Sequence, residues 1–394
     1  MGGRAICMPT ALFFLRLCVN LREVEKVNPT IMKVLLAMDS FKGCATSLCV
    51  EQMMAEALRV LGHEVRLMPM SDGGDGMLDS FADAMGADRR SVETTDPLGR
   101  PIMAQYAVEN KSQTAIIETA QACGLCTMRA EERNPLIAST AGVGRLILDA
   151  MGQGCKNFIV GLGGSGTSDA GQGMLRLLAN ELKTENINEK EAFRNMAQKM
   201  GKYNFTLASD VDNPLCGPKG AARVFGPQKG ATPEMVETLD QRAREFAEGA
   251  KRLLGYDRSS EPGAGAAGGL GYAFMQFCGA RARSGAEILM ELTHFDDALA
   301  WSDVVITGEG ASDRQTLMGK LPWRVMERAR ELGRQTWLVS GLVREREALE
   351  GADFGGIWQL KPEGMSTEES MRLDVLKINI ERWCDVVNEC HLPH

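Results

Sequence analysis

Five short apolar segments of this chain each end in a loop that carries a carboxylate, and most of these loops also carry glycine. The first segment, KVLLAM at 33–38, is almost entirely apolar, as expected of a strand buried on both faces of a parallel sheet. Because ligands bind beyond the carboxyl ends of parallel strands, the pattern predicts an α/β fold with one shared polar site. The loops are DSFKG (39–43), SDGGDG (71–76), LGGSGTSD (162–169), DVDNP (210–214) and GEGASD (308–313).

The succession of helix and strand patterns predicts two domains, one inserted into the other. Helical spacing over 47–61 follows the first strand and leads to a second strand, which is typical of a βαβ unit. From 90 to 118, short alternating segments separated by turn residues indicate antiparallel strands, and helix and strand patterns alternate again further on. We therefore expect a first domain formed by 32–95 and 295–394, and an inserted second domain formed by 96–294.

The composition argues against several classes of function. The net charge is −8 and no Lys/Arg run occurs, which disfavours a nucleic-acid partner because phosphate backbones recruit basic surfaces. No apolar stretch approaches the length of a membrane span. The 11 irregularly spaced cysteines indicate reduced thiols in the cytoplasm. We interpret CGLC at 123–126 as core or loop residues, and Cys384, Cys390, His391 and His394 as part of a frayed tail rather than a metal site.

Residues 1–31 differ in sequence pattern from the rest of the chain. The apolar stretch 11–15 is interrupted by Arg16 and is too short to span a bilayer. A poor signal peptide is one interpretation, but no convincing small-residue cleavage site follows it. We favour an upstream start codon with Met32 as the working first residue, because Met32 opens the first clean strand.

Loops that combine glycine with Asp and Lys indicate phosphoryl transfer. Glycine lets backbone N–H groups approach an anionic ligand, but neighbouring carboxylates repel that ligand unless a cation lies between them. Mg²⁺ takes oxygen ligands and bridges phosphates, which resolves the conflict. Since the chain has only four histidines, we expect the general base to be an Asp.

Other motifs leave alternatives open. GLGGSG at 161–166 matches G-x-G-x-x-G after a strand and would indicate a nicotinamide dehydrogenase, but no second strand with an acidic end follows about 20 residues later. A P-loop and the H-R-D motif of protein kinases are both missing from the sequence. The small-residue run at 262–271 is equally consistent with close helix packing and with a backbone cradle for a nucleotide or substrate.

Seven segments follow one another in the order seen in a known family: DSFKG (39–43), SDGGDG (71–76), ERNP (132–135), GLGGSGTSDAG (161–171), DVDNPLCGPKGAARVFGPQKGA (210–231), PGAGAAGGLG (262–271) and TGEGASDRQTLMGK (307–320). Together they resemble the type-1 glycerate kinase family. The resemblance implies ATP-dependent phosphorylation of D-glycerate with Mg²⁺, the 2-hydroxyl being the expected acceptor. It also implies a flavodoxin-like parallel-sheet domain formed by both chain ends, a second α/β domain inserted in it, and an active site in the cleft between them.

Within this hypothesis, candidate roles fall on residues of the same loops. The catalytic candidates are Asp313, as first choice for the base, with Asp39, Lys42 and Asp212. The metal candidates are Asp72, Asp75 and Asp210. Substrate or nucleotide contacts are expected from Ser40, Gly73, Gly74, Gly163, Gly164, Ser165, Asp169, Asn213, Lys229, Glu309, Gln315, Thr316 and Lys320.

The chain departs from the family at Ala311, where Arg is usual, and at Ser168 and Ala170, where Asn and Gly are usual. The loss at Ala311 leaves one cation fewer near the site, and Arg314 is the nearest replacement along the chain. This departure motivates a further alternative, a non-catalytic sensor that binds a small acid through the same loops. The expected partner is D-glycerate, with no nucleic acid or membrane, and the sequence leaves open a monomer or a homodimer.

Overall fold

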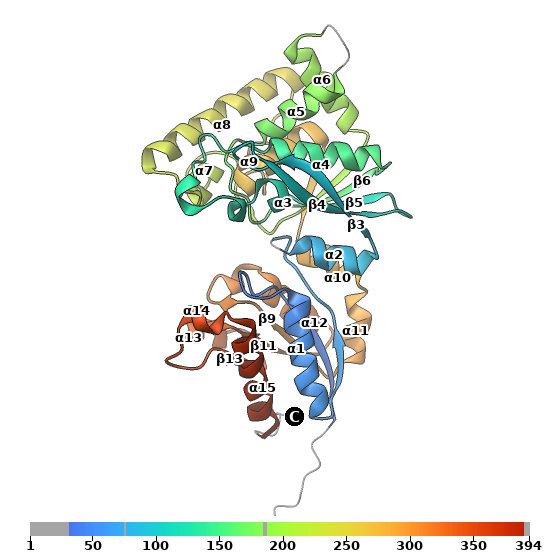
Figure 1. Ribbon diagram of the computed structural model, residues 1–394, viewed down its shortest axis with the longest axis vertical. Helices are drawn as coiled ribbons and strands as arrows, with labels where there is room; N and C mark the ends of the chain where they lie inside the picture. Colours follow the sequence, from blue (N-terminus) through green and yellow to red (C-terminus); the bar gives the residue numbers. More distant parts are fainter. Residues whose placement is uncertain (1–30, 75, 184–186, 390–394) are drawn as a thin grey trace, which may run out of the picture.

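The computed structural model describes residues 31–74, 76–183 and 187–389, which form two large β-sheets with helices packed on them (Figure 1). Predictions that concern residues 1–30, Asp75, Cys390, His391 and His394 lie outside these described residues. Within them, no helix is long and apolar enough to cross a membrane.

The five-stranded sheet is parallel throughout and is built from both ends of the chain. Its central strand, β1, is buried from Val34 onward, in agreement with its apolar sequence. Leu35 lies opposite Arg66 on one side and Val305 on the other. The strand order is β13 (Gly356–Gln359), β11 (Gln335–Ser340), β9 (Val304–Gly308), β1 (Lys33–Met38) and β2 (Glu64–Leu67).

Helices cover both faces of this sheet because successive side chains of a strand point to opposite faces. Val34 and Leu36 pack in one core with the helices α1 and α15, which lie side by side in Figure 1. Leu35 and Ala37 pack in a second core, which includes side chains of α11 and α12. These helices are α1 (Ser47–Val60), α15 (Leu373–Glu389), α11 (Phe295–Trp301) and α12 (Leu321–Glu331).

The six-stranded sheet is mixed. β4 is antiparallel to both of its neighbours, β3 and β5, and the last three strands are parallel to β5. β3 pairs with β4 from Asp88 opposite Val108 to Thr95 opposite Pro101. The predicted domain boundary between residues 95 and 96 therefore falls inside a hairpin, because the hydrogen bonds of β3 go to β4. In order, the strands are β3 (Asp88–Thr95), β4 (Pro101–Glu109), β5 (Thr114–Glu118), β6 (Asn157–Gly161), β7 (Asn204–Ala208) and β8 (Arg281–Arg283).

A layer of two helices lies between the sheets (Figure 1). α2 (Met77–Met85) contacts β4 and β5, and α10 (Gly285–Leu292) contacts α2, α12 and β7. Phe81 of α2 and Leu289 of α10 belong to the core that also contains Leu35. The other face of the six-stranded sheet packs against α4 (Ala141–Gly152), α5 (Gln172–Leu182), α6 (Glu189–Met200), α8 (Pro233–Leu254) and α9 (Ala266–Cys278).

Short elements fill the connections. They are α3 (Ala120–Cys123), α7 (Ala221–Phe225), α13 (Arg346–Glu350), α14 (Thr367–Ser370), β10 (Ala311–Ser312) and β12 (Leu342–Val343), with 3-10 turns at Leu125–Thr127, Ala130–Glu132, Pro227–Lys229 and Thr316–Met318.

Backbone contacts between glycine loops join the two sheets. The Gly163 N–H donates a hydrogen bond to the Gly73 carbonyl oxygen at 3.3 Å. A Cβ atom on Gly163 would lie 2.3 Å from the Gly74 Cα, and one on Gly73 would lie 2.6 Å from the Ala208 carbonyl oxygen. Gly73 also has φ +92°, a conformation that side chains other than glycine rarely adopt. Glycine at these positions is what allows the loops to touch.

Replacing Gly73 by alanine tests this contact, with Gly62→Ala as a matched control. Gly62 has φ +93°, almost the same value, but a Cβ atom there would meet nothing within 4 Å. We expect Gly62→Ala to lower the free energy of unfolding by about 1 kcal/mol through backbone strain alone. Gly73→Ala should lower it by about 3 kcal/mol, because the Ala208 backbone must also move. Urea unfolding measures both, and equal losses would contradict the close contact.

Candidate active site

Two adjoining cavities lie at the carboxyl ends of the strands. The inter-sheet cavity has a volume of about 470 Å³ and is lined from both sheets, for example by Asp72 and Gly163. The side cavity, of about 310 Å³, is lined by the segments that follow β1, β9, β11 and β13. Lys42 and Lys320 line both cavities. A ligand that extends from one cavity into the other therefore meets two ammonium groups.

Most of the residues predicted from the sequence line one of these cavities. Those of the inter-sheet cavity are Lys42, Asp72, Gly73, Gly74, Gly163, Gly164, Ser165, Asp210, Lys229 and Lys320. Those of the side cavity are Asp39, Ser40, Lys42, Glu309 and Lys320. The strand-end loops of the two sheets thus meet in space although they are far apart in the sequence.

Asp72 and Asp210 place two carboxylates at the inter-sheet cavity. Asp72 Oδ1 accepts a hydrogen bond from the Gly74 N–H at 2.9 Å. Both carboxylate oxygens of Asp210 are buried and form no hydrogen bond of full geometry with a described residue, although the Ser284 hydroxyl and the Arg324 guanidinium lie near enough to favour the charged form. Burial raises the pKa of Asp210 to about 6, and the negative charge of Asp72 acts in the same direction. Two like charges with unused lone pairs are an arrangement that a bound cation would stabilise.

Asp39, directly after β1, is a second carboxyl group whose charged form is disfavoured. It is 3% exposed, and its Oδ1 accepts a hydrogen bond from the Ser40 N–H at 2.7 Å. Burial raises the pKa of Asp39 well above its usual range, the charge of Asp72 adds to the rise, and the Lys42 ammonium opposes it. A carboxylate with a raised pKa is suited to accept a proton near neutral pH.

Glu309 holds Lys320 at the boundary of the two cavities. Its Oε2 lies 3.4 Å from the Lys320 Nζ. Its Oε1 accepts hydrogen bonds from the hydroxyl groups of Thr316 at 2.6 Å and Ser312 at 3.2 Å. Thr316, which is fully buried, therefore positions Glu309 and does not line either cavity.

Lys229 is a buried cation on the wall of the inter-sheet cavity. It is 2% exposed, and its Nζ donates hydrogen bonds to Ser165 Oγ at 2.9 Å and to the Thr167 carbonyl oxygen at 2.6 Å. Burial lowers the pKa of Lys229 to about 8, although Cys123 and Asp169 oppose this change. The ammonium group keeps one N–H that these two hydrogen bonds leave unused.

Two of the predicted contact residues have structural partners instead. Asp169 accepts hydrogen bonds from the N–H groups of Thr140, Gly171 and Gly173, each at 3.0 Å, and from the Thr140 hydroxyl. It joins α4 to the start of α5 and lines neither cavity. Asn213 donates from Nδ2 to the Lys219 carbonyl oxygen at 2.8 Å and also lines neither.

The predicted base, Asp313, also lies outside both cavities. Its Oδ1 accepts a hydrogen bond from the Gln315 N–H at 2.8 Å, which forms a turn. Gln315 is exposed, and Asp212 lines a neighbouring depression with Arg324 that shares Asp210 with the inter-sheet cavity. Arg314 is exposed as well and does not fill the place left by Ala311.

The small-residue run at 262–271 packs closely against a neighbouring loop and also reaches the inter-sheet cavity. Gly268 has φ +67°, and a Cβ atom there would lie 2.1 Å from the Thr167 carbonyl oxygen. The run therefore packs closely against the loop that follows β6. Ala266 and Ala267 line the inter-sheet cavity.

Comparisons with known proteins identify the family. The sequence model of the glycerate kinase family matches residues 34–388. The chain belongs to the glycerate kinase family. A glycerate kinase of Halalkalibacterium halodurans is 37% identical over 86% of this chain and 93% of its own, and the glycerate 2-kinase of Escherichia coli is 35% identical over 80% and 86%. A crystal structure described as a glycerate kinase 2 of Salmonella typhimurium LT2 has a TM-score of 0.74 and 32% identity, covering 91% of this chain and 98% of its own.

Membership in the glycerate kinase family makes the chain an enzyme, a kinase that phosphorylates glycerate. The non-catalytic sensor is therefore the wrong alternative. The dehydrogenase interpretation also loses its structural basis. Gly163 and Gly164 line the inter-sheet cavity, but α5 begins only at Gln172, so GLGGSG does not open a helix as a dinucleotide motif does.

Sequence reasoning missed the contribution of the last strands to the side cavity. Arg344 follows β12, Lys361 follows β13, and Asn379 lies on α15, and all three line that cavity with Ala311. The rule used for the five earlier loops would have found Arg344 and Lys361, because they too follow short apolar strands. Nothing in the local sequence marks Asn379.

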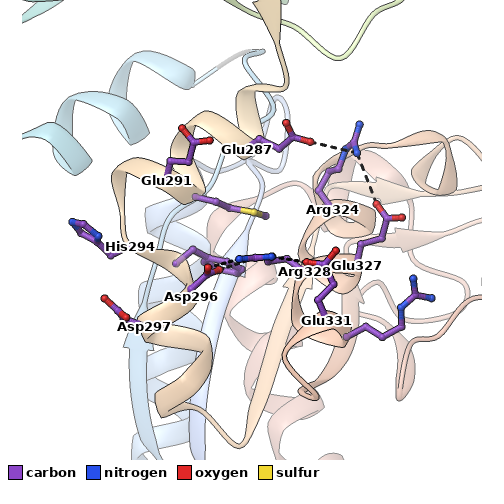
Figure 2. A pocket seen from close by; sticks show the side chains of 12 residues that line it. Glu287, Glu291, His294, Asp296, Asp297, Arg324, Glu327, Arg328 and Glu331 are labelled. Atoms are coloured by element: carbon purple, nitrogen blue, oxygen red, sulfur yellow. Dashed lines mark hydrogen bonds and ion pairs between the residues drawn. The ribbon is translucent and has the colours of Figure 1, made fainter.

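A third, surface cavity lies between α10, α11 and α12, as Figure 2 shows. Its charged side chains pair with one another: Arg324 lies 3.6 Å from Glu287, and Arg328 Nε donates to Asp296 at 2.7 Å. None of the residues predicted from the sequence lines it.

Asp169→Asn distinguishes structural support from ligand contact. An asparagine would present an NH₂ group to backbone donors that now meet a carboxylate. We expect a loss of about 2 kcal/mol in the free energy of unfolding. Asp212→Asn, at an exposed position, should change it by less than about 0.5 kcal/mol. Urea unfolding of both variants is the measurement, and an unchanged Asp169→Asn would mean that these hydrogen bonds contribute little.

Proposed function

We propose that this enzyme transfers the γ-phosphoryl group of ATP to D-glycerate at the boundary of the inter-sheet and side cavities. The observation that carries the proposal is that Lys42 and Lys320 line both cavities. A donor in one cavity and an acceptor in the other would meet at these two cations, where charge develops on the transferred group.

We also propose that the five-stranded sheet is a flavodoxin-like domain into which the rest is inserted. Numbered along the chain within this sheet alone, its strands lie in the order 2-1-3-4-5, which is the flavodoxin-like order. Ligands of such sheets bind where the order reverses, next to the first strand. Asp39 and Lys42 follow that strand, which supports their place in the site.

Asp72 and Asp210 are suited to hold Mg²⁺. Asp210 offers two buried oxygens of which the Ser284 hydroxyl satisfies at most one, and Asp72 adds a second negative charge close enough to raise the pKa of Asp210. Among the described residues no group of three or more His, Cys, Asp and Glu side chains could hold a metal ion. Two carboxylates fit Mg²⁺, which is usually bound by one or two carboxylates together with substrate phosphates. When bound, the ion would neutralise phosphate charge.

Glycerate is proposed to bind in the inter-sheet cavity. Its carboxylate would be held by the Lys229 ammonium group and by backbone N–H groups of Gly163 and Gly164, since such groups favour anions. Asp39 is proposed to accept the proton of the attacking hydroxyl group, in place of Asp313. Asp39 lines the side cavity, whereas Asp313 lines neither cavity. The charges of Asp72 and Lys42, which line the inter-sheet cavity, act on the Asp39 carboxyl group, so it lies near the boundary of the two cavities.

The 2-hydroxyl is the proposed acceptor, which would make 2-phosphoglycerate the product. The support is the relative from Escherichia coli that is described as a glycerate 2-kinase. The test is an assay of ADP release with D-glycerate, followed by phosphorus NMR of the product. A product phosphorylated at the 3-hydroxyl would overturn the regiochemistry and leave the reaction class intact.

We place the enzyme in the cytoplasm. All eight cysteines among the residues that the structure describes are free thiols, for example Cys123 and Cys126. Free thiols suit a reducing compartment.

The base is tested by Asp39→Asn, with Asp313→Asn as its control. Removing the proton acceptor should lower kcat by about a hundredfold or more. Asp313→Asn should leave kcat within about threefold, because its carboxylate forms a turn away from both cavities. Asp39→Asn should not lower the melting temperature, because it removes a desolvated charge. The reverse pattern, with loss of kcat only in Asp313→Asn, would restore Asp313 as the base.

Lys229 gives the reaction an alkaline limit. Its pKa of about 8 means that the ammonium form is present below that pH and is lost as the pH rises through it. We expect kcat/KM for glycerate to fall roughly tenfold per pH unit above about 8, because the free enzyme then lacks the cation. In Lys229→Met, kcat/KM should be low at every pH, and the fall above about pH 8 should be absent. The same fall in the variant would mean that another group causes it.

A further inference from the structure

The side cavity has apolar walls beside the charged boundary. Phe41, Leu360 and Leu376 line it and are each less than 5% exposed. Leu342 and Met371 add further apolar surface. Its volume of about 310 Å³ is at the lower end of the range for small-molecule sites, which suits part of a nucleotide rather than a whole one.

One buried polar group of this cavity lacks a partner. Asn379 lines the cavity and is 3% exposed. Its Oδ1 accepts no hydrogen bond from any described residue, and its Nδ2 reaches only the sulfur of Met365 at 3.8 Å. Leaving a buried acceptor unpaired is costly, so an N–H donor on a ligand would be favoured there.

Two further cations lie at the same cavity. The side chains of Arg344 and Lys361 form no hydrogen bond or ion pair with any described residue, in contrast to Lys320, which faces Glu309. The cavity therefore combines apolar walls, one unpaired acceptor and positive charge that continues through Lys42 and Lys320 into the inter-sheet cavity.

We propose that the side cavity binds the adenosine part of the nucleotide, with its base against the apolar walls and its 6-amino group donating to Asn379 Oδ1. The phosphates would extend past Lys42 and Lys320 toward the inter-sheet cavity. This assignment rests on the proposed function, because it takes ATP as the donor. Glycerate is the less suitable occupant, since it has almost no apolar surface to cover Phe41, Leu360 and Leu376.

The test combines ADP titration calorimetry with steady-state kinetics on the full chain. Asn379→Leu should raise the Kd for ADP about tenfold, as expected for one lost hydrogen bond. It should also abolish the preference for ATP over ITP, whose base lacks the 6-amino group, and leave KM for D-glycerate within about twofold. Ser370→Trp, at a partly exposed position on the cavity wall, should raise the Kd for ADP by at least tenfold through steric filling. Arg382→Gln, on the exposed side of α15, should match the wild type.

The outcomes separate this assignment from the proposed function. Absence of ADP release by the wild type with D-glycerate would overturn the proposed function, and the ADP titrations would still decide the occupant of the cavity. An active wild type with ADP binding unchanged in Asn379→Leu and Ser370→Trp would overturn the assignment alone. A rise in KM for D-glycerate with unchanged ADP binding would place glycerate in the side cavity instead. If Asn379→Leu fails to fold, Ser370→Trp decides.

Discussion

The contact of backbone on backbone between the loops after β2 and β6 fixes how the two sheets approach. Gly73 and Gly163 touch there without side chains, and a Cβ atom on either would lie within 2.6 Å of a backbone atom of the neighbouring segment. Neighbouring side chains of these loops, among them Asp72 and Ser165, are thereby brought to one cavity. The close approach costs little because glycine adopts φ +92° without strain.

That approach also explains the electrostatic state of the site. Asp39, Asp210 and Lys229 lie buried or half-buried in the loops around this contact, and burial is the main cause of the pKa shift of each group. The carboxyl groups become easier to protonate and the ammonium easier to deprotonate, because desolvation disfavours either charge. A ligand that brings a cation to the carboxylates and an anion to Lys229 would reverse these penalties. The cost of burying these charges in the free site therefore favours binding of a metal ion and an acid together.

The α/β class and most of the residues that line the two cavities could be predicted from the sequence, because short apolar strands and their polar ends are local patterns. The same rule selected Asp169, which joins the starts of α4 and α5, and Asp313, which forms a turn in its own loop. In the sequence, an Asp that lines a cavity cannot be told from an Asp that completes a turn. Only the three-dimensional course of the loop decides where the carboxylate lies. The predicted boundary divided the hairpin of β3 and β4, because β3 is a polar, mostly exposed edge strand whose sequence carries little apolar pattern. Asn379 could not be predicted as a residue of the side cavity, because its place there depends on how α15 packs.

The two cavities divide the proposed reaction between the sheets. The side cavity, with Asp39, belongs to the five-stranded sheet, whereas Gly163, Gly164 and Lys229 come from loops of the six-stranded one. Donor and acceptor would therefore be held by separate rigid units, and the distance between them would depend on the glycine contact and on the helix layer of α2 and α10. Because proximity contributes strongly to phosphoryl transfer, a small change in that contact is expected to alter turnover more than the affinity for either ligand.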